Sequence, residues 1–180
     1  MTSSATAPWV SELAQQHLDA AYNLGRWLLG NEHDAADAVH DAYLRATRSA
    51  HTYAGGNARA WWLAIVRNCC IAALNTRGRE TPRGDAAAIV DDSVDVDATA
   101  TTDVEASVQA AQQGNLIEQR LRALPVEFRE ALILREIEDL SYREIADVLA
   151  VPIGTVMSRL ARARASLQKS LASEEAGHGL

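Results

Sequence analysis

Residues 140–169 of this 180-residue chain contain two helical patterns separated by a short interruption, and this pairing constrains the fold more than any other stretch. Ser141 followed three residues later by Glu144 is the capping-box pattern of a helix N-terminus. The sequence Ala-Val-Pro-Ile-Gly at residues 150–154 then interrupts the apolar repeat. Pro152 suits the first turn of a new helix because it has no N–H to leave unpaired. The stretch therefore predicts two helices joined by a tight turn.

The second of these helices pairs an apolar stripe with a polar face of hydroxyls and arginines. No acidic residue lies between Asp147 and Glu174. A short capped helix, a turn and such a second helix form the helix-turn-helix arrangement that enters the DNA major groove. Arginine can read guanine edges, and hydroxyls can bind bases or phosphates. An ordinary solvated helix hairpin with a basic face is the alternative. The candidate DNA contacts are Thr155, Ser158, Arg159 and Arg162.

The net charge of −7 argues against a nucleic-acid partner only until it is mapped along the chain. Between Asp85 and Glu105 lie seven acidic residues and neither Lys nor Arg, so this segment carries −7 and the remaining residues sum to zero. Residues 78–113 are rich in Gly, Asp, Ala, Thr and Val, and we interpret them as an acidic flexible linker.

Helical patterns at residues 9–29, 34–49 and 58–75 precede the linker, and patterns at 116–123 and 126–139 follow it. No strand pattern appears, so the sequence predicts an all-α protein of two small helical modules. No apolar run reaches the roughly 18 residues of a membrane-spanning helix. The start of the chain lacks a secretory pattern, and the adjacent Cys69 and Cys70 cannot join distant segments by disulfides. We therefore expect a cytoplasmic protein.

The chain resembles the extracytoplasmic-function (ECF) sigma factors of bacterial RNA polymerase in both modules. The C-terminal module supplies Leu124-Pro125, Arg129, Leu134-Arg135, Leu140-Ser141-Tyr142, Glu144-Ile145-Ala146, Pro152, Gly154-Thr155-Val156, Ser158-Arg159-Leu160 and Arg162-Ala163-Arg164. The N-terminal module supplies Asp37, Val39, Asp41, Leu44, Arg45-Ala46, Ala60-Trp61, Ile65 and Arg67-Asn68. Two modules in the right order resemble the family more specifically than a lone helix-turn-helix.

The resemblance implies a division of labour between the modules. Residues 9–77 would form a three-helix, region 2-like module that binds the largest polymerase subunit and opens the minus-10 element. Residues 114–171 would form a region 4-like helix-turn-helix that reads the minus-35 element and touches the second-largest subunit. The linker, residues 78–113, would thread the polymerase cleft. Its acidic residues would either act as a polyanion attracted to a channel built for RNA, or serve as a plain solubilising spacer. The resemblance further implies an anti-sigma partner and no catalytic site of its own. The residues themselves predict no metal, no cofactor and no membrane insertion.

The residues of the N-terminal module that are expected to bind polymerase or DNA could each have a purely structural role instead. Asp37, His40 and Asp41 are the expected polymerase contacts, or else a solvated face on which Asp41 pairs with Arg45. The loop at residues 51–57 precedes two tryptophans, so loop and rings could trap an unstacked base, or else the rings are core. We expect at least one tryptophan to be core. The expected minus-10 contacts are Asn57, Trp61, Arg67 and Arg77.

Some positions depart from the family pattern, and two other classes of protein compete with this interpretation. A DNA-binding regulator that never joins polymerase would leave the N-terminal module unexplained. A metal protein or enzyme using His33, His40, Cys69 and Cys70 lacks the paired spacing of metal ligands. The departures are Ala36, His40, Ala72, Asn75 and Ala150, the last at the helix-turn-helix turn where the family usually has glycine.

Overall fold

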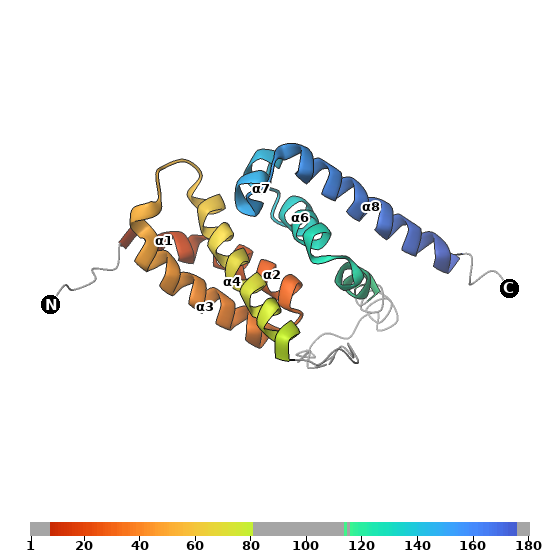
Figure 1. Cartoon of the computed structure of the whole chain (residues 1–180), viewed down its shortest axis with the longest axis horizontal. Coiled ribbons are helices and arrows are strands. Elements are labelled where there is room, and N and C mark those ends of the chain that lie inside the picture. Colours follow the sequence, from red (N-terminus) through yellow and green to blue (C-terminus); the bar gives the residue numbers. More distant parts are fainter. Residues whose placement is uncertain (1–7, 81–113, 115, 176–180) are drawn as a thin grey trace, which may run out of the picture.

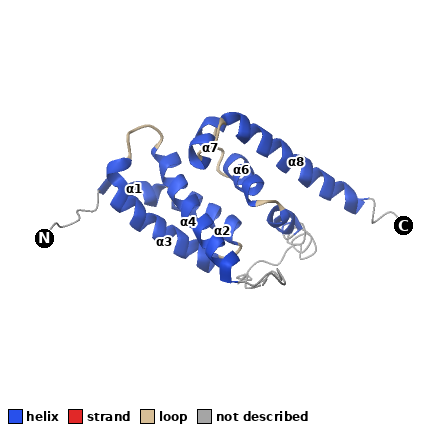
Figure 2. Cartoon of the chain, viewed as in Figure 1, coloured by secondary structure: helices blue, strands red, loops and turns tan. Residues whose placement is uncertain are grey.

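The computed structural model describes residues 8–80, 114 and 116–175, and every regular element within those ranges is helical (Figure 2). The described elements confirm the predicted all-α class with an N-terminal and a C-terminal group of helices. The N-terminal group comprises α1 (Pro8–Gln16), α2 (Leu18–Leu29), α3 (Glu32–Ser49), the short 3-10 helix η1 (Ala50–Thr52) and α4 (Ala58–Glu80). The C-terminal group comprises α6 (Val126–Glu136), α7 (Tyr142–Leu149) and α8 (Ile153–Glu175).

The expected single helix at residues 9–29 is wrong, because the chain turns at His17 between α1 and α2. The backbone of His17 has φ −120° and ψ 26°, outside the helical region. The helical hydrogen bonds continue across this break: the His17 N–H donates to Leu13 and the His17 carbonyl accepts from Ala21, both at 3.1 Å. The break lets α1 and α2 each pack on α3 and α4 in its own direction.

The corner between α2 and α3 is built from local signals that the sequence shows. Gly30 has φ +84°, and its N–H donates to the Arg26 carbonyl at 2.8 Å, which ends α2. The Asn31 side chain then accepts from the Asp34 N–H at 2.8 Å and caps α3. A Cβ on Gly25 would lie 3.2 Å from the Cβ of Ala35, so this glycine permits the close approach of the two helices.

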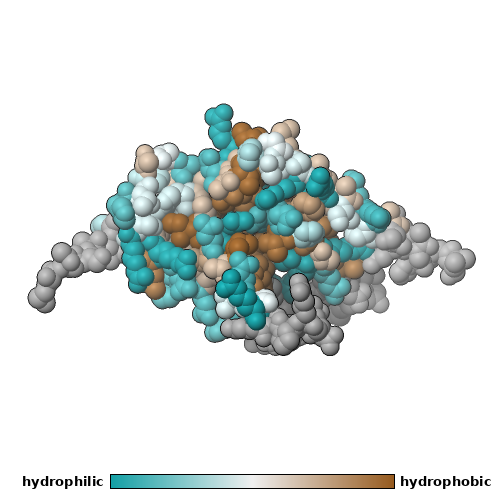
Figure 3. Space-filling view, viewed as in Figure 1, coloured by the Kyte–Doolittle hydropathy of each residue, from teal (hydrophilic) through white to brown (hydrophobic). Residues whose placement is uncertain are grey.

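The modules pack against each other, α2 on α6 and α4 on α7, as Figure 1 shows. One hydrophobic core runs through both of them. Figure 3 shows hydrophobic side chains gathered towards the middle of one face of the molecule. The expected linker, residues 78–113, lies outside the described residues except for residues 78–80, which extend α4 beyond its predicted end. The largest fully buried apolar side chains are Trp62, Leu24, Leu28, Leu63, Ile133, Leu134, Leu140, Ile145, Leu160, Val10 and Val66.

The helix-turn-helix forms without a glycine at its turn. Ser141 and Glu144 make both hydrogen bonds of the capping box at the start of α7, as predicted. Ala150 ends α7 in the left-handed conformation (φ 53°, ψ 47°), and the next residue, Val151, donates its N–H to the Ala146 carbonyl at 3.1 Å. Two hydrogen bonds to the Pro152 carbonyl open α8. The buried stripe of α8 is Val156, Leu160 and Ala163.

Candidate nucleic-acid and partner interfaces

The polar face of α8 presents most of the residues expected to bind DNA. Ser158 and Arg162 are exposed, and Thr155 is half-buried beside them. The Ser158 hydroxyl donates to the Thr155 carbonyl at 3.0 Å, one turn earlier in the helix. Hydroxyls and guanidinium groups on an exposed helix face that carries no acidic residue can bind phosphates or base edges. Three of the four candidates therefore share one surface.

Arg159 differs from the expectation that it shares an exposed face with Arg162. Its Nη1 lies 3.2 Å from a carboxylate oxygen of Glu130, and its side chain is 22% exposed. Glu130 comes from α6, is 0% exposed, and accepts two further hydrogen bonds from Arg67 of α4, at 2.8 and 3.0 Å. A buried carboxylate needs such partners to offset its lost hydration. The structure thus brings a minus-10 candidate and a minus-35 candidate to one carboxylate.

Sequence reasoning missed Glu130, although a signal was present. Glu130 falls at helical spacing from Val126, Ile133 and Leu134, on the inner face of α6. An ionisable side chain on an apolar helix face is rarely buried unless it is paired. The position therefore pointed to a buried ion pair, but its partners are distant in the sequence and could not be named from it.

An aromatic cluster forms where the loop before α4 meets the start of that helix. Trp62 is fully buried in the core, which agrees with the expectation for one of the two tryptophans. Trp61 is only partly buried, and its ring centroid lies 5.5 Å from that of Trp9 and 5.6 Å from that of Tyr53. Partly exposed aromatic rings at such spacing offer stacking surfaces for unpaired bases. Tyr53 belongs to the loop that was expected beside the tryptophans, whereas Trp9, from α1, was not expected at this site.

Asn57 and Arg77, the other minus-10 candidates, also make contacts within the protein. The Asn57 side-chain oxygen Oδ1 accepts from the Ala60 N–H at 3.0 Å, which caps α4, and the side-chain nitrogen Nδ2 donates to Glu144 of α7. Arg77 forms an ion pair with Asp34 and donates to the Leu29 carbonyl at 3.2 Å. Arg77 therefore holds the end of α4 to the corner between α2 and α3.

The outer face of α3 carries the residues expected to bind polymerase. Asp37, His40 and Asp41 are all exposed, and the His33 ring lies 3.5 Å from the Asp37 carboxylate, one turn away. This face meets a mainly apolar pocket of about 490 Å³ between α1, α2 and α3, which His40 helps to line. A surface of exposed carboxylates beside an apolar hollow suits a basic helical partner.

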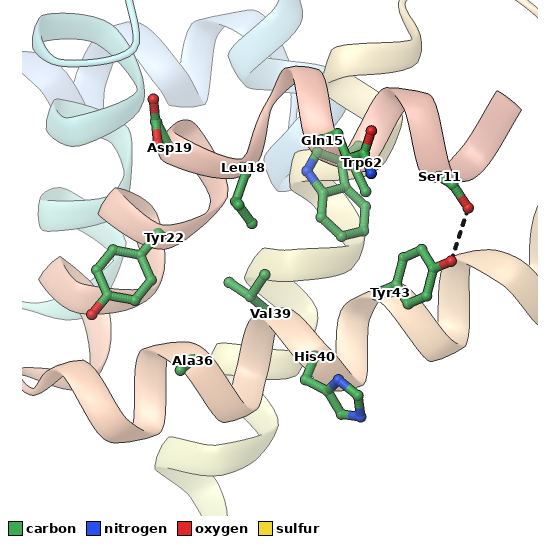
Figure 4. A pocket seen from close by; sticks show the side chains of 11 residues that line it. Ser11, Gln15, Leu18, Asp19, Tyr22, Ala36, Val39, His40, Tyr43 and Trp62 are labelled. Carbon is green, nitrogen blue, oxygen red and sulfur yellow. Dashed lines mark hydrogen bonds between the residues drawn. The ribbon is translucent and has the colours of Figure 1, made fainter.

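Figure 4 shows this pocket from close by. Ser11 and Tyr43 share a hydrogen bond of 2.8 Å at one end of it, and Leu18, which is 50% exposed, projects from α2. Ala36, one of the positions that depart from the family pattern, lines the pocket, and its small side chain leaves this part of the pocket open. Trp62 contributes to the lining, and its buried indole nitrogen has no hydrogen-bond acceptor within the described residues.

The described residues contain no cluster of side chains suited to a metal ion. No group of three His, Cys, Asp or Glu side chains there could hold a metal ion. Cys69 and Cys70 are both buried and free. Burial, followed by the neighbouring Cys69, raises the pKa of the Cys70 thiol to about 12, and burial also raises the pKa of Cys69. Thiols in this state are poor metal ligands and poor nucleophiles.

Family comparisons assign both modules. Residues 13–80 match sigma-70 region 2, and residues 114–167 match sigma-70 region 4. The RNA polymerase sigma-H factor of Pseudomonas aeruginosa is 35% identical over 142 residues, which are 77% of this chain and 73% of that protein. The ECF RNA polymerase sigma-E factor of Escherichia coli is 30% identical, over 77% of this chain and 74% of that protein. The chain belongs to the ECF sigma factors.

One further ECF sigma factor and two solved structures match over more of the chain. SigE of Mycolicibacterium smegmatis is 36% identical over 168 residues, or 93% of this chain, and the chain spans 63% of that relative's length. The solved structure of the sigma factor RpoE with the anti-sigma factor NepR, from Bartonella quintana, matches with a TM-score of 0.69 at 26% identity. That match covers 90% of this chain and 96% of that one. CnrH in complex with CnrY matches in fold, with a TM-score of 0.65 at 22% identity, over 94% and 92%.

Sigma factors are DNA-binding transcription initiation factors. Membership of the ECF sigma factors places this protein in that class. In the part of the chain that the structure describes, no helix is both long enough and apolar enough to cross a membrane.

Proposed function

We propose that this ECF sigma factor binds core RNA polymerase and directs it to promoters through the two modules. Residues 9–77 form the region 2-like module, residues 114–171 form the region 4-like module, and residues 78–113 link them. The observation that carries the proposal is that one chain presents separate surfaces suited to a protein partner, to unpaired bases and to a DNA groove. A helix-turn-helix regulator that acts without polymerase would need only the last of these surfaces.

The region 4-like module binds the minus-35 element through α8. Thr155, Ser158 and Arg162 supply the accessible contacts, and Arg159 joins them once its guanidinium leaves Glu130. Serine, threonine and arginine side chains on one helix face can grip phosphates and read base edges together. The same module touches the second-largest polymerase subunit.

The region 2-like module binds the opened minus-10 element and the largest polymerase subunit. The aromatic cluster around Trp61 stacks an unpaired base, and Asn57, Arg67 and Arg77 hold the strand around it. On another side of the module, Asp37, His40 and Asp41 meet the polymerase, with the adjoining pocket taking an apolar side chain of the partner. The two activities use different elements: α4 with the loop before it, and the outer face of α3.

The remaining assignments concern setting and regulation. The protein acts in the cytoplasm, where the polymerase is, and contributes no catalytic group because the polymerase performs the chemistry. An anti-sigma factor is the expected regulatory partner, as in the RpoE–NepR structure that the chain resembles.

Co-purification with core polymerase tests the proposal, using a charge reversal on α3. Asp41→Lys should weaken the complex on the order of tenfold or more, because a carboxylate facing a basic partner becomes a repelling cation. Asp147→Lys is the matched control: it makes the same change in charge at an exposed position on α7, outside the proposed surface. Failure of the unaltered protein to form a complex at micromolar concentration would favour the polymerase-independent regulator.

A further inference from the structure

The contact between the modules joins proposed promoter-binding side chains to carboxylates of the other module. Arg67 of α4 donates two hydrogen bonds to Glu130 of α6, at 2.8 and 3.0 Å. Asn57, at the start of α4, donates to Glu144 of α7. Both donors belong to the N-terminal module and both acceptors to the C-terminal module. Two of the proposed minus-10 contacts are therefore occupied by acidic groups in this arrangement.

Glu130 also occupies a proposed minus-35 contact. Its second guanidinium partner is Arg159 of α8, at 3.2 Å, and the carboxylate itself is 0% exposed. A carboxylate that accepts paired N–H donors from arginine presents oxygens much as a phosphate does. One buried acid thus takes the place of DNA phosphate for an arginine from each module.

We propose that this interface is an autoinhibitory closed state in which Glu130 and Glu144 compete with promoter DNA for Arg67, Arg159 and Asn57. DNA binding then requires α6 and α7 to separate from α4, after which the same arginines bind phosphate. The inference rests on the proposed function, because it needs those three side chains to contact DNA. The apparent affinity of the free chain is reduced by the small fraction of open molecules.

A second cross-module ion pair supports closure without involving a proposed DNA contact. Arg59 of α4 donates to a carboxylate oxygen and to the backbone carbonyl of Glu138, both at 3.0 Å. The Glu138 side chain is 6% exposed. This pair offers a way to open the interface while leaving Asn57, Arg67 and Arg159 intact.

The first test replaces Glu130 in the full chain and measures shape and DNA binding separately. Glu130→Gln should increase the radius of gyration in small-angle X-ray scattering. It should also tighten binding of the free chain to a fluorescein-labelled, mixed-sequence duplex with a single-stranded bubble, on the order of tenfold, because a charged hydrogen-bond acceptor is lost from the closed state. Glu136→Gln is the matched control: Glu136 lies on the same helix and pairs with Arg164 within the C-terminal module, 2.6 Å apart. That variant should match the unaltered protein in both measurements.

The second test guards against a Glu130 variant that fails to fold, which circular dichroism would reveal. Arg59→Glu should open the chain and tighten DNA binding, and Arg59→Glu combined with Glu138→Arg should restore the closed shape and the weak binding. Restoration by the swapped pair is not expected from a general loss of stability.

The outcomes separate the closed state from the proposed function. An unchanged radius of gyration in folded Glu130→Gln and Arg59→Glu, or an opened chain with unchanged DNA affinity, overturns the autoinhibition. If Arg67→Ala and Arg159→Ala bind promoter DNA as well as the unaltered protein when assembled with polymerase, the assigned DNA contacts are wrong. The scattering result would still report whether the ion pairs hold the modules together.

Discussion

The guanidinium of Arg129, on α6, donates a hydrogen bond of 3.1 Å to the backbone carbonyl of Trp27 in the last turn of α2. It also donates to the carbonyls of Arg122 and Leu124, at 2.9 and 3.2 Å. The carbonyls at the end of a helix have no partner within that helix, so a cation from another element satisfies both their hydrogen bonding and the helix dipole. One side chain thus ties α2 to α6 and to the segment before α6.

Replacing Arg129 should destabilise the protein. Arg129→Met should lower the free energy of unfolding by about 2–4 kcal/mol, because it leaves buried carbonyls unpaired. Burial, followed by the charge of Arg122, lowers the pKa of this arginine, but the group stays protonated. Urea denaturation followed by circular dichroism measures the change. Arg143→Met, on the exposed face of α7, should alter stability by less than about 0.5 kcal/mol.

Ala150 should be improved by glycine. Its left-handed backbone strains an L residue, so Ala150→Gly should raise the free energy of unfolding by about 0.5–1 kcal/mol. The same change at Ala146, inside α7, should lower it by about 1 kcal/mol, because glycine is a poor helix former. Thermal denaturation of the two variants compares them directly. Equal destabilisation by both glycines would mean that the turn does not strain Ala150.

Local signals explain how much of this fold could be predicted from the sequence. The capping box at Ser141, the stop at Gly30 and the apolar stripe of α8 each depend on residues within one or two turns, and all three form as expected. The break at His17 carries no glycine or proline, and it follows from how α1 and α2 pack on α3 and α4. Tertiary packing decided that element rather than local preference.

The sequence predicted which residues belong to the candidate sites better than it predicted which of them touch one another. Arg67 and Arg159 were recognised as cations suited to DNA, but their common partner, Glu130, lies 63 and 29 residues away from them in the sequence. The aromatic cluster was predicted in part: the loop that holds Tyr53 was expected beside Trp61, whereas Trp9 reaches both rings only through the packing of α1. These contacts depend on tertiary packing: the aromatic cluster and the Arg159–Glu130 pair form within one module, and the Arg67–Glu130 pair forms between the two.

The capping box should make stability depend on acid pH. The Ser141 backbone N–H, and then its side chain, hold the pKa of Glu144 below its usual value, with a smaller contribution from Asn57. A carboxyl whose pKa is lowered by folding adds stability above its unfolded pKa, and this stability is lost as the pH falls through its folded pKa. The stability difference between the unaltered protein and Glu144→Gln should therefore shrink below about pH 4.

Urea denaturation at a series of pH values tests this dependence. Asp147→Asn, an exposed carboxylate on the same helix, provides the control and should leave the profile parallel to that of the unaltered protein. A difference for Glu144→Gln that stays constant down to pH 2 would contradict the assignment.

The two cysteines should be unreactive in the folded protein. Thiolates, not thiols, attack disulfide reagents, and burial keeps the pKa of both thiols high, that of Cys70 at about 12. Neither should react with Ellman's reagent at pH 8 until guanidinium unfolds the chain. Ser166→Cys, at an exposed position on α8, should react at once and serves as the positive control. Rapid labelling of the native cysteines would instead support a redox role.

Arg162 should contribute directly to promoter binding. It is exposed on the face of α8 that carries no acid, and within the described ranges it makes no ion pair that must break first, unlike Arg159. Arg162→Ala should weaken minus-35 binding by about 1–3 kcal/mol if the guanidinium contacts a guanine, and the loss should fall mainly on one base position. Polymerase assembled with each variant, titrated with promoter DNA and with single-base variants of it, gives the measurement. Lys169→Ala, two turns further along the same helix, removes a charge at an exposed position and should cost less. A uniform loss across all base variants would mean that Arg162 binds a phosphate rather than a base.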